Sequence, residues 1–222
     1  MLSIDDPKVA AVLDRLHRSA RGDWLFFARH LPLMARLFFG KETPAAEQAT
    51  LLKDVYIPIS RAQGRFLYLV ARSIGAQRIV EFGTSFGVST IYAAAAARDN
   101  GGRVIGTELE PGKHRAALAH LDEAGLSDCV EVRLGDATET LRDIEAPVDL
   151  LLLDGWKELY MPILHLVEPK LRPGAVVLAD NIKTFRRALA GYVDYMQRGR
   201  NGFASVTLPL KDGFEYSVRL DT

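Results

Sequence analysis

Short apolar runs alternate with stretches of helical spacing from Gly75 onward. Apolar runs of roughly four to eight residues, bounded by turn residues, are typical of strands buried on both faces of a sheet. Five such strands are predicted, at residues 78–82, 103–108, 130–134, 148–154 and 175–180. Helical spacing lies between them, at residues 88–98, 111–124, 137–143 and 160–171. The alternation predicts a parallel sheet with helices on both faces.

The pattern changes after the fifth strand. Residues 185–198 have helical spacing, and two more strands are predicted at 203–208 and 215–220. The turn Pro-Leu-Lys-Asp-Gly joins these two strands, and a connection this short predicts an antiparallel hairpin. We therefore expect a sheet that is parallel except for one strand. Helix stops are expected at Gly102, Gly125 and Pro173-Gly174.

Residues 1–57 precede this core and are interpreted as an N-terminal helical extension, which leaves residues 58–222 as the main domain. Apolar side chains gather between residues 24 and 39, in the pattern of a helix pair with a large apolar face. Three roles are open to the extension: covering a ligand site, pairing two subunits, or burying one edge of the sheet. We expect a homodimer.

Composition narrows the classes of partner. Lys plus Arg and Asp plus Glu each number 28, so a formal net charge of zero offers little attraction to nucleic acid or an anionic membrane. The first residues are acidic where a signal peptide would be basic, and no apolar stretch approaches the ~20 residues that span a bilayer. The single cysteine, Cys129, cannot form an internal disulfide. We expect a cytoplasmic protein that binds neither nucleic acid nor membrane.

Polar side chains close two of the predicted strands. Asp154 follows a run of four leucines, and Asp180 and Asn181 follow Ala-Val-Val-Leu-Ala. If the two strands are neighbours, these oxygen ligands and Lys157 lie side by side at one edge of the sheet. Oxygen-only ligation suits Mg²⁺, and a lysine beside the cation suggests proton removal.

The turn after the first strand indicates a nucleotide-type cofactor. It reads Glu81-Phe-Gly83-Thr-Ser85-Phe-Gly87 and leads into a helix, where glycines let the backbone approach a ligand. A carboxylate at Glu81, where a dinucleotide motif has its first glycine, would repel a pyrophosphate and suits a cationic amino-acid group. Glu108, at the end of the next strand, is placed to accept both ribose hydroxyls. S-adenosylmethionine has an ammonium and no phosphate, and fits both positions.

A third strand end contributes to the same crevice. Gly135-Asp136-Ala137 follows the strand at 130–134 and is placed to meet the adenine. Asp136 is also a predicted helix N-cap, and the two roles are compatible.

With these pieces in place, the chain resembles the magnesium-dependent catechol and caffeoyl-CoA O-methyltransferase family over residues 57–220. The resemblance is most specific in Leu-Asp-Gly-Trp-Lys-Glu-Leu-Tyr-Met-Pro at 153–162 and Leu-Ala-Asp-Asn-Ile at 178–182. The turn Leu-Pro-Leu-Lys-Asp-Gly at 208–213 is also similar. The resemblance implies an α/β fold with the Rossmann-like, seven-stranded class I methyltransferase sheet, in the order 3-2-1-4-5-7-6 with strand 7 antiparallel, and with extra N-terminal helices.

The same resemblance implies roles for individual residues. It makes Asp154, Asp180 and Asn181 the Mg²⁺ ligands and Lys157 the general base. It places Trp156, with Lys157 and Asn181, against the substrate. Together with the strand-end argument, it assigns S-adenosylmethionine to Ile59, Glu81, Gly83, Ser85, Ser89, Glu108, Asp136, Ala137 and Asp154.

Two positions depart from the catechol enzyme of this family. That enzyme has a histidine before the tryptophan, where this chain has Gly155, which removes one side of the adenine pocket. It also holds the second catechol hydroxyl with a glutamate shortly before the terminal hairpin turn, where Ala-Ser-Val-Thr at 204–207 contains no acid. The resemblance therefore implies a small phenolic acceptor with adjacent hydroxyls, without fixing catechol itself.

The expected function is metal-dependent transfer of the methyl group of S-adenosylmethionine to a hydroxyl of such an acceptor. The transfer needs a phenolate, whereas a free phenol has a pKa of about 10. A cation bound to the acceptor oxygen and a lysine whose pKa burial has lowered would together remove the proton. Two alternatives stay open: O-methylation of a modified tRNA base, against which the neutral charge counts, and a non-catalytic protein that binds the cofactor.

Overall fold

The computed structural model describes residues 2–23, 29, 52–199 and 201–221 of the chain. Its centre is a seven-stranded sheet with the order β3-β2-β1-β4-β5-β7-β6. The strands are β1 (Arg78–Phe82), β2 (Arg103–Glu108), β3 (Val130–Leu134), β4 (Val148–Leu153), β5 (Leu171–Ala179), β6 (Phe203–Leu208) and β7 (Phe214–Arg219). β7 is antiparallel to both β5 and β6, and the pairs among β1 to β5 are parallel. The predicted fold class and strand order are confirmed.

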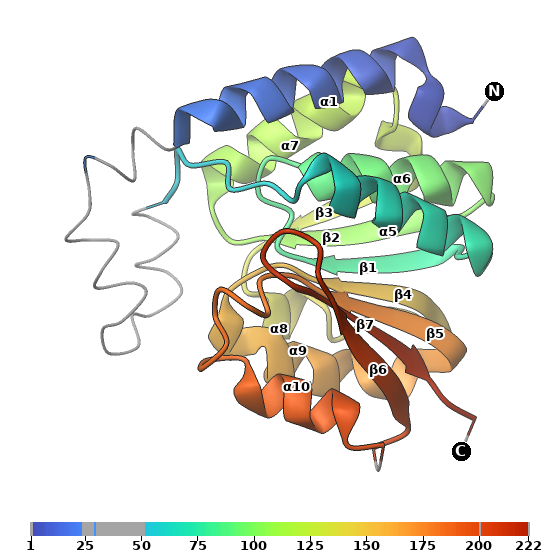
Figure 1. Cartoon of the computed structure of the whole chain (residues 1–222). Helices are drawn as coiled ribbons and strands as arrows, with labels where there is room; N and C mark the ends of the chain where they lie inside the picture. Colours follow the sequence, from blue (N-terminus) through green and yellow to red (C-terminus); the bar gives the residue numbers. More distant parts are fainter. Residues whose placement is uncertain (1, 24–28, 30–51, 200, 222) are drawn as a thin grey trace.

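Helices cover both faces of the sheet (Figure 1). One layer holds α1 (Pro7–Ser19), α5 (Arg61–Ser73), α6 (Val88–Asp99) and α7 (Pro111–Glu123). The other holds α8 (Ala137–Thr140), α9 (Tyr160–Val167) and α10 (Ala190–Gln197). Short 3₁₀ helices are η1 (Ser3–Asp5), η2 (Ala20–Gly22), η3 (Ser127–Cys129), η4 (Lys157–Leu159) and η5 (Glu168–Lys170).

Alternate residues of the central strands pack against opposite layers. Leu150 of β4 belongs to the core cluster that includes α5 and α6, whereas its neighbour Leu151 belongs to the cluster that includes α9 and α10. This follows from the two-residue period of a strand. All six residues of β4 are buried, which explains why its sequence is a nearly continuous apolar run.

The start of β5 differs from the prediction. The helix expected at 160–171 ends at Val167, and Pro173-Gly174 lies inside β5 rather than stopping a helix. Leu171 pairs with Val148, and the register between β4 and β5 then shifts before Val176. Proline is tolerated there because the ladder is irregular, so its missing N–H is not needed. The helix expected at 185–198 is also shorter, since α10 covers only Ala190–Gln197.

Part of the N-terminal extension falls within the described residues. α1 is amphipathic and packs Val12 and Leu16, among others, into the core on the α6 side of the sheet. The apolar helix pair predicted at residues 24–39 lies, apart from Arg29, outside the described residues. No helix in the described part of the chain is long and apolar enough to cross a membrane.

Candidate active site

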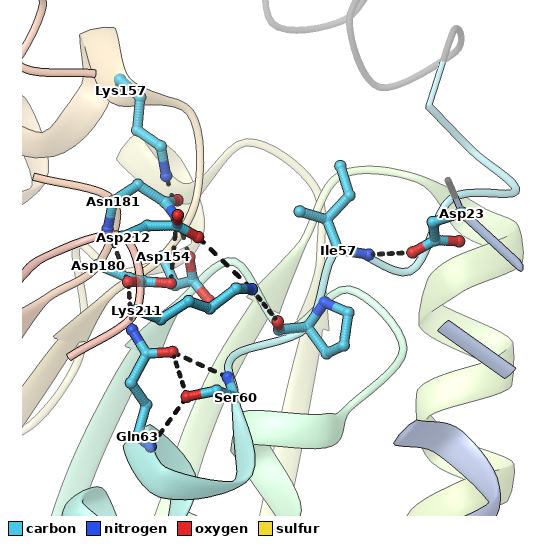
Figure 2. Close-up of polar contacts among 11 residues, drawn as sticks. Asp23, Ile57, Ser60, Gln63, Asp154, Lys157, Asp180, Asn181, Lys211 and Asp212 are labelled. Carbon is cyan, nitrogen blue, oxygen red and sulfur yellow. Dashed lines mark hydrogen bonds and ion pairs between the residues drawn. The ribbon is translucent and has the colours of Figure 1, made fainter. Parts of the chain in front are cut away.

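Two predicted cation ligands lie at neighbouring strand ends. Asp154 follows β4 and Asp180 follows β5, and the last residues of these strands, Leu153 and Ala179, are paired in the sheet. The backbone N–H of Asp180 also donates to the carbonyl of Leu153 at 3.0 Å. Figure 2 shows both carboxylates facing the same space, with Lys157 beside them. The pairing of parallel strands β4 and β5 thus brings together two side chains that are well separated along the chain.

Asp180 is almost completely buried, at 2% exposure. Its Oδ1 accepts hydrogen bonds from Nε2 of Gln63 at 2.6 Å and from the backbone N–H of Asn181 at 2.7 Å. Its Oδ2 accepts from Nδ2 of Asn181 at 3.2 Å. Asn181 has a left-handed backbone with φ of 65°, a conformation that asparagine tolerates better than most residues.

Lys157 begins η4 and points back toward Asp154. Its Nζ donates to the carbonyl of Gly155 and to the hydroxyl of Tyr160, both at 2.9 Å, and lies 3.9 Å from Oδ1 of Asp154. The same nitrogen stands 5.5 Å from the ring centre of Phe185. Burial lowers the pKa of Lys157, and the nearby carboxylates only partly oppose this. A larger neutral fraction is what a lysine general base needs.

The donor set fits an oxygen-preferring cation. Burial, followed by the charge of Asp180, raises the pKa of Asp154 well above its usual range, and burial also raises the pKa of Asp180. Asp180 is buried and Asp154 is largely shielded from solvent, with its side chain 14% exposed, so the repulsion between the two carboxylates would be relieved by a divalent cation between them. A half-turn of the Asn181 amide would exchange Nδ2 for an oxygen donor. Among the described residues, no three His, Cys, Asp or Glu side chains form a possible metal group, so the candidates are these two carboxylates and one amide.

Glu81 is fully buried on β1 and has one oxygen without a partner. Its Oε2 accepts from the hydroxyls of Thr84 and Thr90, and the buried hydroxyl of Ser89 partly opposes the rise in the pKa of Glu81. Its Oε1 has no hydrogen-bond partner. Burial raises the pKa of Glu81, and Glu108 adds to the effect. An unpaired buried carboxylate oxygen is a suitable acceptor for the ammonium of an amino-acid cofactor.

The turn after β1 is shaped by close backbone approach. Gly83 has φ of 98°, and a Cβ there would lie 2.6 Å from the backbone nitrogen of Gly155. Ser85 also has a positive φ, 49°, and its N–H donates to Oε2 of Glu108 at 2.7 Å. Oε1 of Glu108 accepts from the N–H of Glu110 at 2.8 Å. Each Glu108 oxygen keeps acceptor capacity for a ribose hydroxyl.

The other predicted site residues are Asp136, Ala137, Ile59 and Trp156. Asp136 is the N-cap of α8 and accepts from the N–H of Thr138 at 2.8 Å, as expected for that role. Ala137 and Ile59 are buried, at 5% and 1% exposure. Trp156 is half-buried and packs on the core cluster of the α9 layer.

Two neighbours of the site were not predicted. Gln63 contacts Asp180, and Lys211, in the β6–β7 turn, lowers the pKa of both Asp154 and Asp180 by its charge. The Nζ of Lys211 donates to the carbonyl of Pro58 at 3.2 Å. The pattern Ser60-x-x-Gln63 before an apolar run predicts a capping box, but not the contact of Gln63 with Asp180.

The sequence of this chain is similar to those of known methyltransferases. A family model described as a methyltransferase domain matches residues 80–182. The chain is 39% identical over 127 residues to a catechol O-methyltransferase of Mycobacterium tuberculosis, in an alignment that spans 57% of each chain. A catechol O-methyltransferase of Niastella koreensis is 35% identical over 130 residues, which is 57% of this chain and 58% of that protein. The chain thus matches somewhat more than half the length of these curated relatives.

A solved structure extends the likeness to most of the chain. The O-methyltransferase TomG of Streptomyces achromogenes, in complex with S-adenosylmethionine, has a TM-score of 0.69 and 27% sequence identity. The match covers 85% of this chain and 95% of TomG.

Proposed function

This chain belongs to the class I O-methyltransferases of the catechol and caffeoyl-CoA type, and from that membership we propose that it methylates a hydroxyl of a small aromatic acceptor with adjacent hydroxyls. The methyl donor is S-adenosylmethionine, and the reaction depends on a divalent cation such as Mg²⁺. The observation that carries the proposal is the meeting of Asp154, Asp180 and Lys157 at paired strand ends. When bound, the cofactor supplies an electrophilic methyl group and the cation lowers the pKa of the acceptor hydroxyl.

Two acidic residues supply the cofactor half of the site. Glu81 offers an unpaired, buried oxygen to the ammonium of the methionine part. Glu108 offers two oxygens to the ribose, held in place by the N–H groups of Ser85 and Glu110. Both carboxylates lie at the carboxyl ends of adjacent strands, where ligands of open α/β sheets bind.

Lys157 takes the proton from the acceptor hydroxyl. Its Nζ is anchored by the carbonyl of Gly155 and by Tyr160, whose hydroxyl donates to the backbone carbonyl of Asp180 at 3.2 Å. This chain of contacts ties the base to the strand end that carries the cation ligands. Asp154, Asp180 and Asn181 hold the cation, and Trp156 forms part of the acceptor wall.

The stretch without an acid near the terminal hairpin supports an acceptor class wider than catechol. Ser205 and Thr207 of β6 donate their hydroxyls to Glu215 of β7, a completely buried residue. These two side chains are therefore engaged inside the protein. Catechols, flavonoids and caffeoyl thioesters with adjacent hydroxyls are all suitable test acceptors.

The decisive experiment is a chelator-controlled activity screen over those three acceptor classes. We expect methyl transfer with Mg²⁺ and loss of transfer in excess EDTA. Lys157→Ala should lower kcat/KM by about 10²–10⁴-fold, because it removes the base. The exposed Lys8, on α1, provides the matched control, and Lys8→Ala should retain wild-type kinetics. Full activity in excess EDTA would exclude the cation, and wild-type rates in Lys157→Ala would exclude the base.

No feature of the described residues favours the tRNA acceptor or the non-catalytic cofactor-binding protein. The homodimer and the role of the N-terminal extension stay predictions.

A further inference from the structure

Gln63 is a completely buried polar residue in the first turn of α5. It belongs to a capping box with Ser60. Its Oε1 accepts from the backbone N–H and from the hydroxyl of Ser60, both at 2.8 Å, and its own N–H donates to Oγ of Ser60 at 3.2 Å. A capping box uses only an oxygen of this side chain, so a glutamate would serve as well. The amide nitrogen of Gln63 is not needed for the cap.

That nitrogen is directed at the predicted cation site. Nε2 of Gln63 donates to Oδ1 of Asp180 at 2.6 Å, and Figure 2 shows the side chain bridging Ser60 and Asp180. The backbone N–H of Ser60 can only donate, and an ionised Asp180 can only accept. Both ends therefore require the same orientation of the amide, with the oxygen toward Ser60 and the nitrogen toward Asp180. A glutamate in this position would face Asp180 with a like charge.

The contact determines which oxygen of Asp180 is available. Oδ1 receives two N–H groups, from Gln63 and from the backbone of Asn181. Oδ2 has only the longer contact, 3.2 Å, with the side-chain amide of Asn181. Two donors on one oxygen fix the rotation of the carboxylate and direct Oδ2 away from α5. Partners that orient a metal-binding carboxylate typically change metal affinity 10–100-fold when they are removed.

We propose that Gln63 is a positioning residue, which holds Asp180 in the orientation that binds the divalent cation. It thereby joins the cation site to the N-terminus of α5, which begins at Arg61, two residues after the predicted cofactor residue Ile59. The inference rests on the proposed function, because it assumes that Asp180 is a cation ligand. The simpler interpretation is that Gln63 only caps α5.

Two variants separate the interpretations. Gln63→Met removes both the cap and the contact with Asp180 while keeping a similar side-chain length. Ser60→Ala removes the capping hydroxyl but keeps the backbone N–H that orients the amide of Gln63. Binding of Mn²⁺ to the full-length protein is measured by electron paramagnetic resonance of the free ion, in the presence of S-adenosylhomocysteine, whose own binding reports a folded site.

We expect Gln63→Met to bind Mn²⁺ at least about tenfold more weakly than the wild type, and Ser60→Ala to stay within about twofold. Both variants should melt at a lower temperature, because both weaken the cap. Equal Mn²⁺ affinity in Gln63→Met and wild type would overturn this inference while leaving the proposed function intact. Absence of Mn²⁺ binding in the wild type would instead overturn the cation in the proposed function.

A measurement on the wild type does not depend on whether Gln63→Met folds. The side-chain amide signals of Gln63 should shift in ¹H–¹⁵N spectra when Mg²⁺ is added, since the hydrogen-bonded carboxylate acquires a cation. Saturating Mg²⁺ that shifts the backbone signals of Asp180 and leaves the Gln63 amide signals unmoved would also overturn the inference.

Discussion

At the scale of single residues, Gly155 leaves space beside the site that the ring of Phe82 fills. The resemblance to the catechol enzyme implies a histidine at this position, and the sequence alone suggests that glycine removes one side of the adenine pocket. In the structure a Cβ at Gly155 would lie 2.5 Å from the ring of Phe82, which is itself buried at 5% exposure. The ring of Phe82 thus occupies the space beside Gly155, so a side chain there requires a change at both positions.

We predict that Gly155→Ala destabilises the protein by about 1–3 kcal/mol, because the added methyl group overpacks against Phe82. Chemical denaturation of the two proteins measures the difference. Gly22→Ala is the control, since nothing lies within 4 Å of a Cβ at that position. The double variant Gly155→Ala with Phe82→Leu should recover part of the lost stability, because the smaller side chain leaves room for the methyl group. If the effects of the two substitutions on the free energy of unfolding simply add, the Phe82 ring does not cause the destabilisation.

Residues of the candidate site differ in how far the sequence predicted them. Asp154, Asp180 and Lys157 were found because each directly follows or adjoins a recognisable strand end. Gln63 and Lys211 were missed, since their partners Asp180 and Pro58 are 117 and 153 positions away along the chain. No local pattern reports a contact over such a separation.

At the scale of elements, α5 and α6 pack closely through a glycine. A Cβ at Gly64 of α5 would lie 2.3 Å from the ring of Tyr92 of α6. Tyr92 is buried at 3% exposure, so its ring has little room to move. Gly191 of α10 is different, because it is exposed and nothing lies within 4 Å of a Cβ there.

The two helix glycines should therefore respond to alanine with opposite signs. Gly64→Ala is expected to destabilise the protein by about 1–3 kcal/mol through overpacking. Gly191→Ala should stabilise it by up to about 1 kcal/mol, because alanine restricts the unfolded chain and favours the helix. Melting temperatures of both variants test the pair, and a rise for Gly64→Ala would contradict the packing argument.

Strand bounds were predicted better than helix bounds. β1, β2, β3 and β6 have the predicted limits, because apolar runs between turn residues are local signals. The start of β5 was missed because it depends on a tertiary contact. Arg172 donates to the carboxylate of Asp149 at 2.6 Å and to the carbonyl of Ile74 at 3.0 Å, which holds an otherwise strand-breaking Pro-Gly segment against β4.

The stability of the whole molecule should depend on pH through His17 of α1. Its Nε2 lies 3.3 Å from the hydroxyl of Tyr92. Burial, followed by the charges of Arg61 and Lys211 and opposed by that of Asp14, lowers the pKa of His17 to about 4. The unfolded chain, with a histidine pKa of about 6.5, binds this proton more readily. The contribution of His17 to the free energy of unfolding is therefore complete above pH 6.5 and is lost as the pH falls toward 4.

We predict that His17→Gln reduces the loss of stability between pH 6.5 and 4, by on the order of 1–2 kcal/mol after allowance for solvent screening. Glutamine keeps a polar partner for Tyr92 but takes up no proton. Urea unfolding at pH 7.5, 6.5, 5 and 4 gives the two profiles. Parallel profiles for wild type and variant would show that His17 does not contribute to the acid sensitivity.

The sequence by itself determined the sheet, its strand ends and the chemical types that gather there, because hydrophobic period, turn residues and strand-end motifs are local properties of the chain. It also indicated the family through Asp154, Lys157, Asp180 and Asn181. Only the tertiary structure decided that an oxygen of Glu81 lacks a partner. The tertiary structure also decided which oxygen of Asp180 receives two donors and in which direction burial shifts the pKa values of Asp154 and Lys157. These properties arise when elements that are separate along the chain pack together and exclude water from the site, and no local pattern encodes that packing.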